Sequence, residues 1–169
     1  MRHCASCHVV IPELQNSKYC PACRRIARGR WLQKIRDSAT AKESRDSEFR
    51  RLWNTAKAAG LAAGERVRPE PMHVVQHANM ADDSSPVVKA WEVSEGTCGF
   101  AWVVIRHATC SFARWLAKNG LGGRGYGGGC HVWIREHNQS LERKDMHAEA
   151  MAKVFKDAGL YAIACSRMD

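Results

Sequence analysis

Residues 98–105, CGFAWVVI, decide the predicted fold of the C-terminal half of this 169-residue chain. The run is apolar without alternation, as expected for a central strand that is buried on both faces of a sheet. A second strand-like run, VVKAWEV, precedes it at residues 87–93, and the intervening SEGT favours a tight hairpin. We therefore expect two neighbouring strands of one sheet between residues 87 and 105.

Strand and helix signals alternate after this run. SFARWLAKNG (111–120) predicts a short helix, CHVWI (130–134) a strand and LYAIAC (160–165) a final strand. The periodic sequence before the final strand predicts a longer helix, with Ser140 as its N-cap and Gly159 at its end. The order β-β-α-β-α-β predicts an α+β fold, in which residues 87–169 form a small mixed sheet with two packed helices.

These C-terminal segments resemble a family of small uncharacterised proteins from tailed bacteriophages. The resemblance covers about residues 97–169. It is carried by CGFAWVVI, SFARWLAKNG, HVWI with the following HNQSLERKDMHAEAMAKVF, and the closing SRMD. It implies a phage origin for the chain and no particular activity.

Two cysteine pairs, Cys4-x-x-Cys7 and Cys20-x-x-Cys23, lie twelve residues apart near the N-terminus. Each pair can form a knuckle, and two knuckles supply the four thiolates of a closed tetrahedral Zn²⁺ site. Turns between the pairs are expected at Pro12 and at residues 15–17. We predict a structural zinc ribbon or knuckle over residues 1–23, similar to such modules in general. It is not catalytic, because four sulfur ligands leave no position for water.

A basic segment follows the second cysteine pair directly. Before the first acidic residue, Asp37, it carries six cations together with one tryptophan: Arg24, Arg25, Arg28, Arg30, Trp31, Lys34 and Arg36. We predict that residues 24–66 form two helices, the second beginning near Ser47 as N-cap. The polar SATAKESRDS between them is compatible with a loop or an exposed helix. Residues 67–86, which contain RVRPEPM and ADDSSP, are predicted as a linker.

The excess positive charge is concentrated in this first part of the chain. Residues 1–71 hold 15 Lys and Arg against 7 Asp and Glu, whereas residues 72–169 hold 11 against 10. Such asymmetry is typical of a basic arm that seeks a polyanion. We therefore expect a phage-encoded, non-enzymatic accessory protein in which the cations contact phosphates of DNA or RNA and Trp31 stacks on a base.

Two other functional classes remain open. The chain is compatible with a virion component, or with a protein that docks on a host machine such as RNA polymerase. It is also compatible with an enzyme whose site lies in the C-terminal domain, if His107, His131, His137 and Glu136 converge on a pocket. Sequence leaves the oligomeric state and the identity of any protein partner undetermined.

The glycine-rich GLGGRGYGGG (120–129) gives a weaker signal. Its literal G-x-G-x-x-G follows a helix and precedes a strand, the reverse of the dinucleotide-binding context, so we predict a flexible loop. Arg124 and Tyr126 within it are secondary candidates for contact with single strands. His147-Ala-Glu149 matches the H-x-E of zinc deaminases, but no C-x-x-C follows it, and the two side chains point to different sides of a helix.

Membrane association is not expected, since no run of 18 apolar residues is present. The N-terminal MRHCASCHVV lacks the apolar stretch of a secretory signal. We expect the protein in the reducing cytoplasm of a bacterial host, and possibly carried into the virion, with the isolated Cys98, Cys110, Cys130 and Cys165 as reduced core residues.

Overall fold

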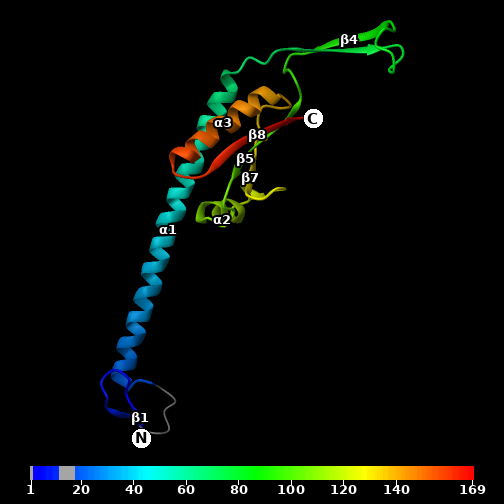
Figure 1. The fold of residues 1–169 in the computed structure, drawn as a ribbon. Helices are drawn as coiled ribbons and strands as arrows, with labels where there is room; N and C mark the ends of the chain where they lie inside the picture. The colour runs from blue at the N-terminus through cyan, green and yellow to red at the C-terminus, as the bar shows by residue number, and fades with distance from the viewer. Residues whose placement is uncertain (1, 12–17) are drawn as a thin grey trace. The chain divides into compact units, whose positions relative to one another are not determined.

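The computed structural model describes residues 2–11 and 18–169, so the turns expected at Pro12 and at residues 15–17 lie outside the described residues. The chain divides into two compact units, Met1–Ser47 and Glu48–Asp169. A single helix, α1 (Pro21–Arg66), continues through this boundary (Figure 1). The units are described separately below.

The prediction of two helices in the basic segment is wrong, because α1 is continuous. SATAKESRDS contains neither proline nor glycine, and nothing in it interrupts the backbone ladder that the flanking residues propagate. Its residues adopt the exposed-helix alternative. Ser47 is therefore not an N-cap; its hydroxyl instead donates to the carbonyl of Ser44 inside the helix, at 2.7 Å.

The N-terminal unit is built around a small hairpin and the start of α1. Strand β1 (Arg2–His3) pairs antiparallel with β2 (Val10–Ile11). Pro21 is the first residue of α1, where its missing N–H removes no helical hydrogen bond. Cys4 and Ile11 are the buried apolar residues among the described part of this unit, so its apolar core is very small.

The C-terminal unit contains a four-stranded sheet in the order β6-β7-β5-β8. Its elements, in chain order, are β5 (Gly99–Ile105), α2 (Ser111–Lys118), β6 (Gly123–Arg124), β7 (Cys130–Trp133), α3 (Leu141–Asp157) and β8 (Ala162–Met168). Each helix connects two strands that leave one place between them, and a strand of the opposite direction fills that place. All pairings are consequently antiparallel, and the expectation of a mixed sheet is wrong in this respect.

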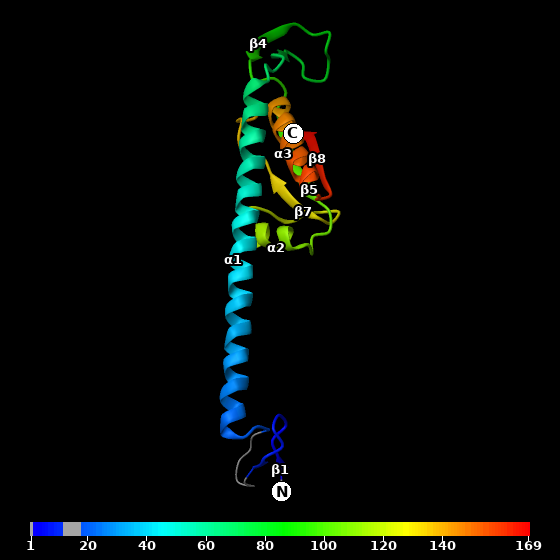
Figure 2. The same ribbon diagram turned by 90° about the vertical axis from the view of Figure 1, so that its left-hand side faces the viewer.

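The helices pack on one face of this sheet (Figure 2). Alternate residues of β5, Ala101, Val103 and Ile105, are fully buried there against side chains from α2, α3 and the second half of α1. Phe100 and Trp102 point to the other face and are partly exposed. The central position of β5 is confirmed, but its burial on both faces is not, because helices cover one face only.

A separate two-stranded ribbon precedes the sheet. Strand β3 (Met72–His77) forms within the segment predicted as a linker and pairs antiparallel with β4 (Val87–Val93) (Figure 1). The predicted hairpin between residues 87–93 and 98–105 is therefore wrong. The turn at residues 78–86 closes the ribbon through hydrogen bonds of Asn79, Asp82 and Ser85, and this local turn selects β3 as the partner of β4.

Helix α3 begins and ends where the sequence predicts. Gly159 follows it with a φ of 81°, the left-handed conformation that glycine tolerates best. Ser140 occupies the N-cap position, but its hydroxyl makes no capping hydrogen bond. Among the described residues its Oγ is buried without a partner, because the Ser140 backbone pairs with Cys98 at the edge of the sheet.

Candidate metal centre

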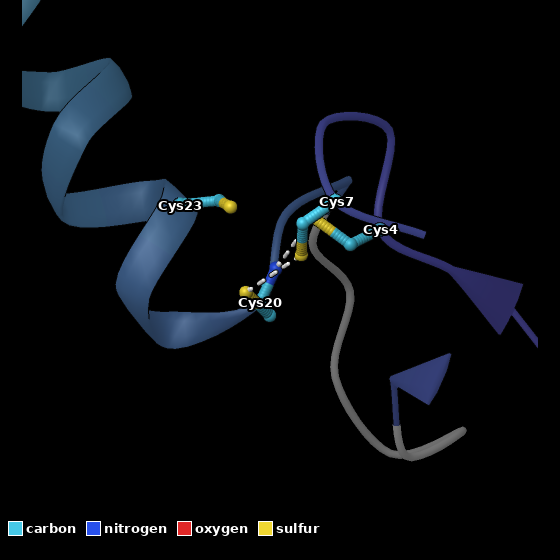
Figure 3. Close-up of side chains that lie close together, drawn as sticks. All are labelled: Cys4, Cys7, Cys20 and Cys23. Atoms are coloured by element: carbon cyan, nitrogen blue, oxygen red, sulfur yellow. Dashed lines mark hydrogen bonds between the residues drawn. The ribbon is translucent and has the colours of Figure 1, made fainter. Parts of the chain in front are cut away.

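The four predicted ligands lie together at the base of α1. The Sγ atoms of Cys4, Cys7, Cys20 and Cys23 are all within 4.8 Å of one another (Figure 3). The Cys7 and Cys20 sulfurs are 3.7 Å apart. Tetrahedral zinc with Zn–S bonds of about 2.3 Å places its sulfur ligands about 3.8 Å apart, so the arrangement fits this ion. All four cysteines are free thiols.

Backbone hydrogen bonds hold each cysteine pair in position. In the first knuckle, the Cys4 N–H donates to the Val9 carbonyl at 2.8 Å, and the His8 N–H donates to the Cys4 carbonyl at 3.0 Å. In the second, the Cys20 N–H donates to the Cys4 sulfur at 3.4 Å. This last bond joins the knuckles and stabilises a thiolate at Cys4.

The thiols influence one another strongly. The backbone N–H of Cys20 is the main cause that lowers the pKa of Cys4 to about 6, and the backbone N–H of Cys23 lowers the pKa of Cys20. The thiols of Cys7 and Cys20 raise the pKa of Cys23 to about 12. Four neighbouring thiolates therefore repel one another unless a cation lies between them, which is the charge balance that Zn²⁺ would supply.

Neither flanking histidine enters this sulfur cluster. His3 and His8 are exposed. Among the described residues, the four cysteines form the one group of three or more His, Cys, Asp or Glu side chains arranged for a metal ion. Cys98, Cys110, Cys130 and Cys165 thus form no second metal centre within that part of the chain.

The six predicted cations of the basic segment do not share one face. Arg30, Trp31 and Lys34 line an open groove of about 400 Å³ beside the cysteines, together with Tyr19 and Cys23. Because an α-helix turns by about 100° per residue, Arg24, Arg25, Arg28 and Arg36 point away from this groove. All six are exposed. Only Arg30 and Lys34 are thus combined with aromatic side chains.

The two secondary candidates lie in the C-terminal unit. Arg124 belongs to β6, and Tyr126 follows in the glycine-rich loop with its side chain fully exposed.

A second polar cluster joins Glu136 and His137 to residues that sequence reasoning did not connect with them. His137 Nε2 and His147 Nδ1 are 2.9 Å apart, and Lys57 Nζ lies 3.2 Å from Glu136. Lys57, Glu136 and His147 line a pocket of about 360 Å³, whereas His107 and His131 do not. The expected convergence of three histidines is therefore wrong. As predicted, His147 is buried in the apolar stripe of α3 and Glu149 is exposed.

Two glycines of α1 make room for this histidine pair. A Cβ at Gly60 would overlap the ring of His147, and one at Gly64 would overlap the ring of His137. Glycine one helical turn after glycine is unfavourable inside a helix, by about 1 kcal/mol each relative to alanine. This pair of glycines was the sequence signal that could have located the histidine cluster.

The histidine pair predicts a pH-dependent stability. Burial is the main cause that lowers the pKa of His147 to about 4, with Lys57 and His137 assisting and Glu136 opposing. Between about pH 6.5 and 4 the unfolded chain binds a proton at His147 and the folded chain does not, so folding free energy is lost as the pH falls. We expect this residue to contribute a loss of roughly 2 to 3 kcal/mol across that window.

Urea unfolding measured from pH 7 to 5 tests this expectation. His147→Asn should flatten the pH dependence, while His107→Asn, at an exposed position, should leave it as in the parent protein. An equal slope in the two variants would contradict the assignment to His147.

Comparisons with known proteins do not extend these findings. No protein-family model, curated protein or solved structure matches this chain. Within residues 2–11 and 18–169, no helix has the length and apolar character that a bilayer span requires.

Proposed function

We propose that this chain is a phage-encoded, non-enzymatic accessory protein that binds nucleic acid through the zinc-stapled start of α1. The observation that carries the proposal is the groove beside the cysteine cluster. It combines two cations, Arg30 and Lys34, with two aromatic side chains, Trp31 and Tyr19. Cations that reach phosphates beside rings that stack on bases are the usual combination in proteins that bind single strands.

The charge of the N-terminal unit supports this proposal. Residues 1–47 hold ten Lys and Arg against four Asp and Glu, a formal charge of +6. A charge of this density attracts a polyanion and accelerates its association. The four remaining arginines of the segment lie around α1, so they favour sequence-independent contact with phosphates.

Zinc would act in this function by fixing the geometry of the groove. Tyr19 precedes the second cysteine pair, and Trp31 and Lys34 follow it on α1. Zinc bound to all four cysteines would hold the β1–β2 turn against the first turn of α1, and so hold both walls of the groove. The ordering entropy would then be supplied by metal binding and not by the nucleic acid.

Reversing the two groove cations tests the proposal. Arg30→Glu with Lys34→Glu should weaken binding to a 15-nucleotide strand at least tenfold at low salt. It should also reduce the slope of log affinity against log salt by roughly 1.5 to 2, as expected for two lost phosphate contacts. Fluorescence anisotropy over a salt series measures both quantities.

Lys42→Glu with Arg45→Glu is the matched control, since it makes the same charge change on α1 beyond the groove. It should cost less affinity than the groove variant. Equal losses in the two variants, or no binding of any strand by the parent protein at low salt, would refute the proposed groove.

A second candidate function is docking on a protein, either in the virion or on a host machine such as RNA polymerase. It is favoured by Ile26, Leu32 and Ile35, which are 56%, 39% and 45% exposed on α1. Leu32→Ser with Ile35→Ser should then abolish co-elution with purified host RNA polymerase, or incorporation into particles, and leave oligonucleotide binding unchanged. Retained association in that variant would exclude this surface.

A further inference from the structure

The face of the four-stranded sheet that the helices leave uncovered carries an unusual set of side chains. We call this the open face. Strand alternation and register assign eight residues to it: Phe100, Trp102, Val104, His131, Trp133, Ile163, Cys165 and Arg167. Of these, only Val104 is buried. None of the four rings belongs to the hydrophobic core cluster.

The rings of the open face form a connected array across β5 and β7. Trp102 and Trp133 lie directly opposite each other in the register, with ring centroids 4.9 Å apart. The His131 ring is stacked against Trp102, at 6.3 Å and 15°. Trp133 remains 47% exposed. The array is therefore held in place by its own members and still presents a ring surface outward.

Cations, and no carboxylates, accompany these rings. Arg167 lies opposite Phe100 on β8, with its guanidinium carbon 5.6 Å from the ring centre. None of the eight residues is Asp or Glu, although residues 48–169 contain thirteen of them. The open face thus combines aromatic surface with positive charge, which suits an anionic ligand with planar groups.

The glycine-rich loop borders the same face. Gly125 lies against the ring of His131 so closely that a Cβ there would overlap it, and Gly129 approaches the Val104 side chain. The loop carries Arg124 and the fully exposed Tyr126. One cation and one ring are therefore placed beside the array on a segment whose glycines allow it to adapt.

We propose that the open face binds single-stranded nucleic acid, with bases stacked on Trp133 and Trp102 and phosphates contacted by Arg167 and Arg124. Rings on a sheet surface can stack only on bases that are unpaired and turned outward, so a duplex does not fit this surface. The site belongs to the C-terminal unit and is distinct from the groove of α1.

Substitution of the two tryptophans in the full-length, zinc-loaded protein tests the proposal. Binding is measured by anisotropy with labelled 15-mers of dT and rU and with a 15-base-pair duplex. Salt is raised to about 0.5 M to suppress contacts that are purely electrostatic. Trp102→Ala with Trp133→Ala should weaken binding of both single strands roughly tenfold or more. Duplex binding at low salt should change less than about twofold.

Trp91→Ala is the matched control, because Trp91 is 44% exposed on the β3–β4 ribbon and lies under Lys89. It should leave single-strand binding unchanged. Trp102→Phe with Trp133→Phe keeps rings on the open face and should restore most of the affinity. If the alanine pair fails to give a parent-like near-UV spectrum, Trp133→Ala with Arg167→Glu replaces it, with the same expected loss.

The outcomes separate this proposal from the function proposed for α1. Single-strand binding that is lost on Trp102 and Trp133 substitution, and kept on Arg30 and Lys34 substitution, supports the open face and contradicts the groove. The opposite result overturns the open face and leaves the groove standing. Absence of single-strand binding by the parent protein, or equal affinity of the Trp91→Ala and Trp102/Trp133 alanine variants, also overturns it.

Discussion

Removing zinc is expected to unfold the N-terminal knuckle module and leave residues 48–169 folded. Among the described residues of the N-terminal unit, Cys4 and Ile11 are the buried apolar ones, so little besides the metal can stabilise that module. Structural zinc binding contributes on the order of 10 kcal/mol in modules of this size. Cys20→Ser should have the same effect as a chelator, because it removes one of four ligands and the hydrogen bond that joins the knuckles.

Two measurements check this result. Zinc released per chain, titrated with a colorimetric chelator, should be one in the parent protein and near zero in Cys20→Ser. Amide hydrogen exchange should become fast over residues 2–11 and 18–24 and remain slow in β5 and α3. Cys165→Ser, outside the cluster, is the control and should retain one zinc. A Cys20→Ser chain that still binds one zinc tightly would contradict the assigned ligand set.

Alanine at two glycines of α1 should have effects of opposite sign. Gly60→Ala would drive a methyl group into the His147 ring, and we expect it to destabilise the C-terminal unit by about 2 to 3 kcal/mol through overpacking. Gly29→Ala meets no atom within 4 Å and should increase helix stability by about 1 kcal/mol. The same substitution in the same helix thus separates the packing effect from helix propensity.

Urea unfolding followed by tryptophan fluorescence measures the first effect, and thermal loss of helical circular dichroism measures the second. The clash itself is tested by a double-mutant cycle, since His147→Ala should remove most of the additional penalty of Gly60→Ala. If the two substitutions are additive, the close contact between Gly60 and His147 does not control stability.

Local sequence patterns were sufficient for the cysteine cluster and for most helices. The four ligands come from two short pairs whose spacing already constrains their geometry, and the structure brings all four together. Helices α2 and α3 were predicted because three to five turns of periodic sequence end at Asn119-Gly120 and at Gly159. The continuity of α1 was left open because SATAKESRDS has no apolar periodicity to indicate its state.

Strand pairing and the histidine cluster lay beyond such patterns. Residues 87–93 can pair with a strand on either side, and only the turn at residues 78–86 and the sheet order decide for β3. His147 was placed correctly on its helix, but its hydrogen bond to His137 spans ten residues and depends on the path between β7 and α3. Gly60 and Gly64 also contact this pair, and they come from a helix almost ninety residues away in the sequence.

The same division applies to residues 98–105. The sequence by itself determined that this run is a central strand, because an uninterrupted β-branched and aromatic run cannot lie at a solvated edge without penalty. It also determined the four cysteine ligands, because their spacing is local. Only the tertiary structure decided that Phe100 and Trp102 are uncovered, since both crossover helices return over the same face of the sheet. Apolar composition records which side chains avoid water, but which face is covered depends on where distant helices pack.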